Sequence, residues 1–151
     1  MFHFLSLVVV LSAYSLTSIA AAADGDKPTP EETAAMQGAW KIESLISDGE
    51  PVAAETIRTW RRLVKNDRVT WKRGEETLVE LSIQYNPRAK PMTMVSTIES
   101  GDAKGQTMLS IYELNGDELR VCFAPPGKPR PKEFSSTPGS GVLMYTARRI
   151  P

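Results

Sequence analysis

Strand-length segments joined by short turns fill most of this chain, and that pattern limits the possible folds more than any other feature. Apolar and polar residues alternate with a period of two from Trp40 to Ser47, as in a strand with one buried face. Short turn sequences such as Asn66-Asp67 and Asn115-Gly116 separate further segments of this kind. Connections this short make neighbouring strands antiparallel, because a parallel pair needs a long crossover.

We expect about eight strands, each of which ends at turn residues. They cover Trp40 to Ser47, Leu63 to Val64, Val69 to Trp71, Thr77 to Tyr85, Pro91 to Glu99, Thr107 to Leu114, Glu118 to Phe123 and Val142 to Arg149. The fold class is therefore predicted to be all-β, an antiparallel up-and-down barrel of about eight strands whose closure removes exposed sheet edges. A β-sandwich is the alternative.

Two short helices are expected beside the strands. Thr29, Pro30 and Glu32 form the pattern of a capped helix start, and Gly38 suits the stop. The segment from Ala53 to Trp60 resembles a second helix, with Ile57 and Trp60 on one face.

A cluster of arginines lies at the end of the expected second helix. Arg58, Arg61 and Arg62 lie close together in the sequence, and we interpret them as a solvated helix end. Acidic and basic residues balance at 18 each. Such a neutral chain gives no reason to expect nucleic acid or an anionic membrane surface as a partner.

The N-terminus has the pattern of a secretory signal peptide. Residues 1–23 contain no Lys, Arg, Asp or Glu; Phe4 to Leu16 is apolar, and Ala20 to Ala23 supplies small residues before Asp24. We expect a signal peptide at 1–23, a short polar segment at 24–33 and a barrel domain at 34–151. The mature protein would be exported, periplasmic or extracellular, with no integral membrane span after cleavage. An uncleaved N-terminal anchor is the alternative.

The residue types available limit the chemistry. The one histidine, His3, lies within the expected signal, and Cys122 is the one cysteine. Histidine-based catalysis, a zinc site and an intramolecular disulfide are therefore not expected, and we predict no metal and no cofactor. Carboxylates at Glu75-Glu76, Glu99 with Asp102, and Asp117-Glu118 leave a carboxylate-based enzyme as the least favoured function.

A proline-rich segment separates the last two expected strands. Its stiff, extended geometry predicts a long loop that either packs on the barrel or forms a binding surface. The candidate binding residues of this loop are Pro125, Pro126, Lys128, Pro129, Arg130, Pro131 and Phe134.

The stretch Gln37-Gly38-Ala39-Trp40-Lys41 has the Gly-x-Trp pattern that opens the first strand of lipocalins and other calycins. This resemblance implies that Trp40 closes one barrel end, and that a basic residue near the last strand, Arg148 or Arg149, packs on its ring. Gly38, Trp40 and these two arginines form the expected structural signature.

The chain also resembles an uncharacterised exported domain family that is common in planctomycetes and is described as lipocalin-like. The resemblance covers roughly residues 34 to 150 and rests on blocks that recur in one order. They are Met36 to Lys41, Asp48 to Val52, Ile111 to Arg120, Cys122 to Pro131 and Phe134 to Gly141. It implies a lipocalin-like barrel but no activity, ligand or catalytic residue.

Two functions fit such a barrel. An exported, non-catalytic binding module would hold a small hydrophobic molecule inside, against adaptable side chains. The candidate lining residues are Met92, Met94, Met108, Tyr112, Met144 and Tyr145. Alternatively, a filled barrel would serve as a structural or interaction module with an envelope protein as partner.

Overall fold

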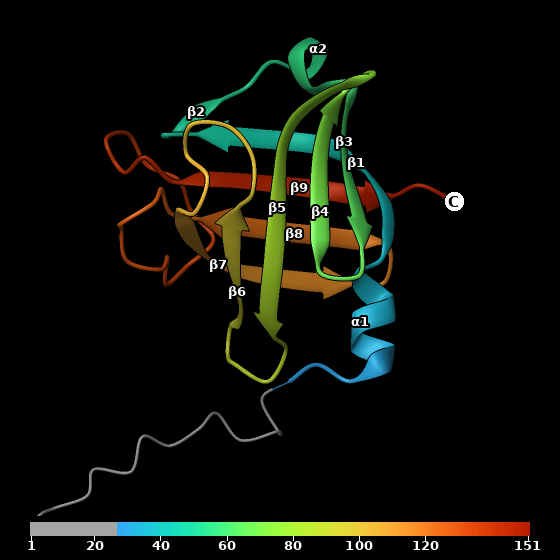
Figure 1. Cartoon of the computed structure of the whole chain (residues 1–151). Helices are drawn as coiled ribbons and strands as arrows, with labels where there is room; N and C mark the ends of the chain where they lie inside the picture. Colours follow the sequence, from blue (N-terminus) through green and yellow to red (C-terminus); the bar gives the residue numbers. More distant parts are fainter. Residues whose placement is uncertain (1–26) are drawn as a thin grey trace, which may run out of the picture.

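The computed structural model describes residues 27–151, which form one antiparallel sheet closed into a barrel (Figure 1). The expected signal peptide lies outside the described residues. The strands are β1 (Gly38–Ser47), β2 (Glu50–Pro51), β3 (Trp60–Lys65), β4 (Arg68–Arg73), β5 (Glu76–Asn86), β6 (Met92–Ile98), β7 (Thr107–Asn115), β8 (Glu118–Phe123) and β9 (Leu143–Arg149).

The order of the strands confirms the predicted up-and-down barrel. From β3 to β9 each strand pairs with the next, and β1 pairs with both β3 and β9, which closes the ring. In Figure 1, β8 and β9 run across the view behind the steeply inclined β4 and β5. The short strand β2, which was not expected, adds to β1 through Ile46 and Pro51 outside the ring.

The two helices are short and lie at opposite ends of the view in Figure 1. Helix α1 (Pro30–Met36) begins with the predicted capping box between Thr29 and Glu32. Helix α2 (Ala54–Ile57) is shorter than expected. Neither helix of residues 27–151 has the length and hydropathy needed to cross a bilayer.

The predicted extension of the second helix to Trp60 is wrong. Trp60 begins β3, where it pairs with Arg73 of β4. Trp60 to Lys65 pair in register with Arg73 to Arg68, so every second pair exchanges backbone hydrogen bonds. Asn66 adopts a positive φ of 57° in the turn that joins the two strands. Tertiary pairing therefore overrides the local helical pattern.

One end of the barrel is closed by α1 and Trp40. Trp40 is fully buried and donates its indole Nε1–H to the carbonyl oxygen of Met36, 3.2 Å away. The guanidinium of Arg149 lies 4.3 Å from the centroid of the Trp40 ring. Arg149 also donates to the carbonyl oxygens of Ala35 and Gln37 at the C-terminal end of α1.

Gly38 and Arg148 are the other two residues of the expected structural signature. Gly38 has φ of 103°, a conformation that favours glycine, and lies beside the Arg149 guanidinium. Arg148 faces outward and forms exposed ion pairs with Glu43 and Glu118. Arg149, not Arg148, is therefore the arginine that packs on Trp40.

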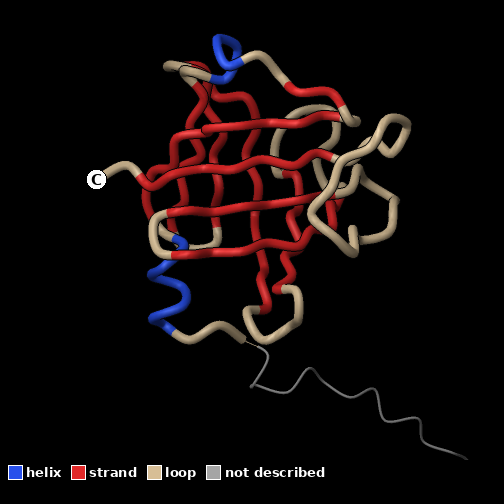
Figure 2. The backbone as a smooth tube through the Cα atoms, turned by 180° about the vertical axis from the view of Figure 1, so that it is seen from behind, coloured by secondary structure: helices blue, strands red, loops and turns tan. Residues whose placement is uncertain are grey.

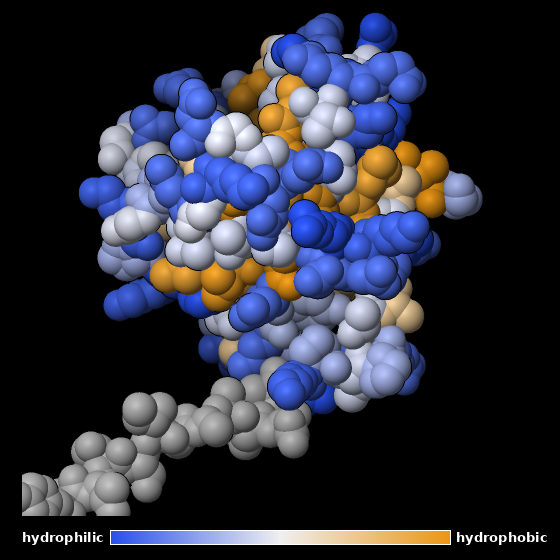
Figure 3. All heavy atoms as spheres, viewed as in Figure 1, coloured by the Kyte–Doolittle hydropathy of each residue, from blue (hydrophilic) through white to orange (hydrophobic). Residues whose placement is uncertain are grey.

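The proline-rich segment is a loop between β8 and β9, as predicted, and it lies beside the barrel wall in two opposite views (Figures 1 and 2). The face of the molecule shown in Figure 3 is largely hydrophilic, and hydrophobic residues appear on it in separate patches.

Candidate functional site

The end of the barrel remote from α1 holds an apolar cup of about 330 Å³. Leu45 and Leu143 lie at this end of the ladder between β1 and β9, whereas Trp40 and Arg149 lie at the other. The cup is lined by Leu45, Trp60, Trp71, Leu78, Val79, Leu81, Ile98, Met108, Phe123, Leu143 and Tyr145. A space of this size and character suits a small organic molecule.

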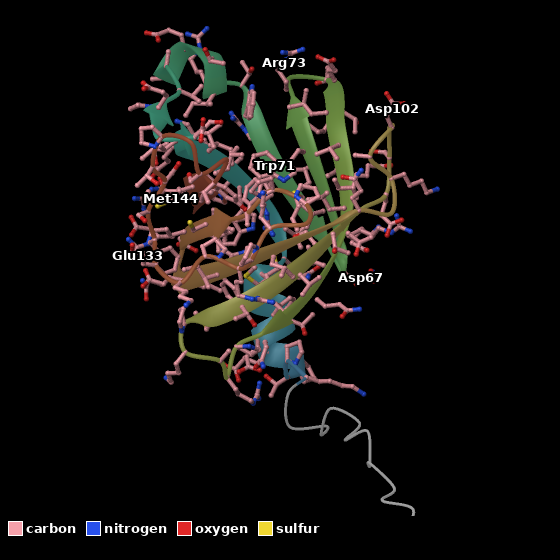
Figure 4. The ribbon with its side chains drawn as sticks, turned by 90° about the vertical axis from the view of Figure 1, so that its left-hand side faces the viewer. Asp67, Trp71, Arg73, Asp102, Glu133 and Met144 are labelled. Carbon is pink, nitrogen blue, oxygen red and sulfur yellow. The ribbon has the colours of Figure 1, made fainter. Side chains whose placement is uncertain are left out.

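Aromatic rings form the rigid part of the cup. Trp71 packs edge-on against Tyr145, with ring centroids 5.0 Å apart, and against Trp60 at 6.4 Å. Phe123 packs on the other side of Tyr145 at 6.4 Å. In Figure 4, Trp71 lies in the interior, whereas Asp67 and Arg73 lie toward opposite ends of β4. Mutual packing holds these rings in place without a ligand.

A smaller and more polar cavity of about 40 Å³ lies against the floor of the cup. Trp71, Leu81, Met108, Phe123 and Tyr145 line both spaces. Its polar lining consists of Arg62, Ser96, Ser110 and Tyr145. A cavity of this size has room for a few water-sized groups.

The interpretation of Arg62 as part of a solvated helix end is wrong. Arg62 is 2% exposed, because β3 directs Trp60, Arg62 and Val64 into the barrel. Arg61 and Leu63, which alternate with them, face outward; Arg61 donates to the carbonyl oxygen of Arg58. Extending the period-two pattern back through Trp60 would have placed Arg62 inside.

Tyr145 and the two serines surround the buried guanidinium. Burial raises the pKa of Tyr145, and the Arg62 guanidinium opposes that rise through its charge and through a side-chain hydrogen bond with Tyr145. The Tyr145 phenol therefore keeps its proton at neutral pH. Ser110 is 2% exposed and donates its hydroxyl to the carbonyl oxygen of Met94 at 3.1 Å, whereas Ser96 lines the cavity from β6.

The candidate lining residues lie in different parts of the barrel. Met108 and Tyr145 line both spaces, and Met94 lines the small cavity. Tyr112 is buried nearer α1, where its ring packs edge-on against Tyr85 and burial raises its pKa.

Met92 and Met144 line neither space. Met92 packs against the buried core of the barrel. Met144 pairs with Ile46 and Cys122 and alternates with the buried Tyr145, so it lies on the outer face.

The proline-rich loop packs on the outer wall. Arg130 donates through Nη1 to the carbonyl oxygen of Ser110 at 2.9 Å and approaches that of Met94 at 3.4 Å. Phe134 lies under the Arg120 guanidinium, 4.1 Å from ring centroid to Cζ.

None of the loop's candidate binding residues lines the cup or the small cavity. They are Pro125, Pro126, Lys128, Pro129, Arg130, Pro131 and Phe134. Pro125 instead lies close to Gly141: a Cβ added to Gly141 would be 3.0 Å from the side chain of Pro125. The contacts of the loop are therefore with the outside of the barrel, with the turn at Asp48 and Gly49, and with itself.

Cys122 lies beneath this loop. Its thiol is fully buried and donates to the carbonyl oxygen of Ser135 at 3.4 Å. Burial raises its pKa, so the reactive thiolate is scarce at neutral pH.

We expect Cys122 to react with a neutral maleimide at least ~100-fold more slowly in the native protein than in urea, because both the raised pKa and the loop protect it. Mass spectrometry of timed samples measures both rates. Equal rates in the two conditions would show that the loop does not cover the thiol.

The candidate carboxylates occupy turns and strand ends. Glu76 pairs with Arg73, Asp117 with Arg149 and Glu118 with Arg148. Within residues 27–151 no group of three His, Cys, Asp or Glu side chains is placed to hold a metal ion. Glu76, Asp117 and Glu118 are therefore engaged with arginines at the surface, whereas Glu99 accepts a hydrogen bond from the Ser82 hydroxyl at 2.7 Å.

Comparison with known proteins adds no relative. No protein-family model, curated protein or solved structure matches this chain.

Proposed function

We propose that this protein is a non-catalytic binding module that holds a small, largely apolar molecule in the cup. The observation that carries the proposal is the cup itself, which has about 330 Å³ of space and is walled by aliphatic and aromatic side chains. Burial of apolar ligand surface there contributes ~25 cal/mol for each Å² removed from water. Export of the protein, inferred from residues 1–23, stays a prediction.

The alternative of an interaction module with a filled barrel has less support. Among the described residues the exposed large hydrophobic side chains are Leu63 and Ile150, whereas a stable protein interface commonly has an apolar centre. The proline-rich loop, which was the candidate partner surface, directs Arg130, Phe134 and Ser135 toward the barrel wall. The cup offers the better-formed site.

A neutral fluorescent dye, N-phenyl-1-naphthylamine, tests the proposal. We expect its fluorescence to rise on binding, and Leu143→Asp to weaken its affinity by ~10-fold or more, because that change puts a carboxylate in an apolar wall.

Leu63→Asp is the matched control, since Leu63 is 36% exposed and does not line the cup. It should leave the affinity within ~2-fold. Absence of dye binding to the unmodified protein, or equal effects of the two variants, would count against the cup as the site.

A further inference from the structure

The interior of the barrel holds a positive charge that residues 27–151 leave without an anion. Arg62 is 2% exposed, and the ion pairs of the described carboxylates involve other cations. Its Nη1 atom is buried with no hydrogen-bond partner among these residues. A buried guanidinium in this condition destabilises the fold unless something else compensates its charge.

We propose that the molecule bound in the cup is a single-chain amphiphile, and that its terminal carboxylate pairs with Arg62. This inference rests on the proposed function, since the cup must accept the apolar chain. Nη1 is the guanidinium nitrogen that has no partner, and it can donate a charge-assisted hydrogen bond to a carboxylate oxygen. The apolar chain would then extend from the small cavity through the cup toward solvent.

The arrangement of the two spaces suits such a molecule. The polar cavity lies deep and measures about 40 Å³, whereas the apolar cup lies outside it and measures about 330 Å³. Met108 belongs to the wall that both spaces share and is unbranched, so its side chain can turn aside as the head group enters.

The neighbouring groups favour an anion over a cation. Tyr145 lines the small cavity with a phenol that keeps its proton and so supplies a second donor. No carboxylate of the described residues lines either space, so the one charged side chain that a cationic head group would meet is Arg62, which repels it.

The size of the cavity and its charge favour a carboxylate over a phosphate monoester. Arg62 is the one cationic side chain, among the described residues, that lines the cavity or the cup. A phosphate monoester carries close to two negative charges and three terminal oxygens, which a single guanidinium does not satisfy. A carboxylate carries one charge and matches one guanidinium.

Three ligands with the same chain test the head group, namely decanoate, decan-1-ol and decylammonium. Their affinities are measured by displacement of N-phenyl-1-naphthylamine at concentrations below self-association. We expect the protein to bind decanoate at least ~10-fold more tightly than decan-1-ol, because a charged hydrogen-bonded pair replaces a neutral contact, and to bind decylammonium most weakly.

Arg62→Met removes the charge and keeps most of the volume. We expect it to lower the affinity for decanoate by ~10-fold or more and to leave the affinities for decan-1-ol and the dye within ~3-fold. Without ligand, the variant should unfold at the same or a higher urea concentration, because an unpaired buried charge is gone. A merely structural arginine would instead show a lower unfolding midpoint and parallel losses for all ligands.

The outcomes distinguish the two proposals. If neither the dye nor any of the three ligands binds the unmodified protein, the proposed function is wrong, and this inference is wrong with it. If the dye and decan-1-ol bind but decanoate binds no more tightly, only the carboxylate assignment is wrong. The three-ligand comparison uses the unmodified protein and therefore holds even if Arg62→Met does not fold.

Discussion

Replacing Trp40 by alanine is expected to lower the free energy of unfolding by ~3–5 kcal/mol, the range for truncating a large buried aromatic side chain. Trp40 is fully buried, and its indole N–H is bonded to the carbonyl oxygen of Met36. The substitution leaves a cavity at the barrel end and removes the contact that holds α1 against it. Urea unfolding followed by circular dichroism measures the loss.

Substitutions of Arg148 and Arg149 measure how much the contact between Arg149 and the Trp40 ring contributes to the free energy of unfolding. Arg149→Ala should cost less than Trp40→Ala, and the double variant should lose less than the sum, because each residue contacts the other. Arg148→Ala is the matched control: its ion pairs are exposed, so it should cost less than Arg149→Ala and add independently to Trp40→Ala. Additive losses for Arg149 would show that the contact with the Trp40 ring contributes nothing to stability.

The closed end of the barrel was predictable because short-range patterns specify it. Thr29 and Glu32 lie three residues apart in a capping box, and Trp40 stands two residues after a glycine. The alternation of Trp40 and Ile42 with polar neighbours predicts the inner face of the first half of β1. The second half departs from the expected period of two, because a register shift between Ile42 and Ser44 turns Leu45 inward in place of Ser44 and Ile46. What the sequence left open was which arginine reaches the ring. That depends on the register of β9 against β1, where Trp40 lies opposite Arg149.

The open end was harder to predict because its chemistry depends on strand register and on a charge in an unusual place. An arginine beside Arg61 suggests a solvated surface, since buried arginines are rare. The pairing of β3 with β1 and β4 turns Arg62 inward, opposite Trp40 and Trp71 in the two ladders, and the helical interpretation of Ala53 to Trp60 hid the alternation that indicates it. Similarly, Met144 is a flexible apolar residue of the kind that can line a ligand site. The register of β9, however, turns the neighbouring Tyr145 into the barrel and Met144 outward.

Replacing residues 127–137 with a short Asn-Gly connection is expected to lower the free energy of unfolding by about 3 kcal/mol or more, because the loop covers an apolar outer wall. Ile111 and Cys122 pair across β7 and β8 and are buried on that wall. The replacement also removes the hydrogen bonds from Arg130 to the strand carbonyl oxygens. Urea unfolding measures the loss, and faster maleimide labelling of Cys122 reports the exposed wall.

The same replacement decides between a structural loop and a binding loop. Because no residue of the loop lines the cup, the shortened protein should still bind N-phenyl-1-naphthylamine under conditions in which it is folded. Loss of dye binding with unchanged stability would mean that the loop forms part of the ligand site. Unchanged labelling of Cys122 would mean that the wall is covered by something else.

A single substitution tests the contact of the loop with the barrel without shortening the chain. Gly49 has φ of 83°, and a Cβ there would lie 2.4 Å from the backbone nitrogen of Pro138. Its amide also donates to the Ser136 hydroxyl at 2.8 Å. Gly101 has a similar φ of 76° with no heavy atom within 4 Å of its Cβ position, so Gly101→Ala carries the backbone strain alone. If the loop is held against the turn, Gly49→Ala must displace it. This variant should then lose more stability than Gly101→Ala and label faster at Cys122, whereas equal losses and equal labelling would show that the turn does not anchor the loop.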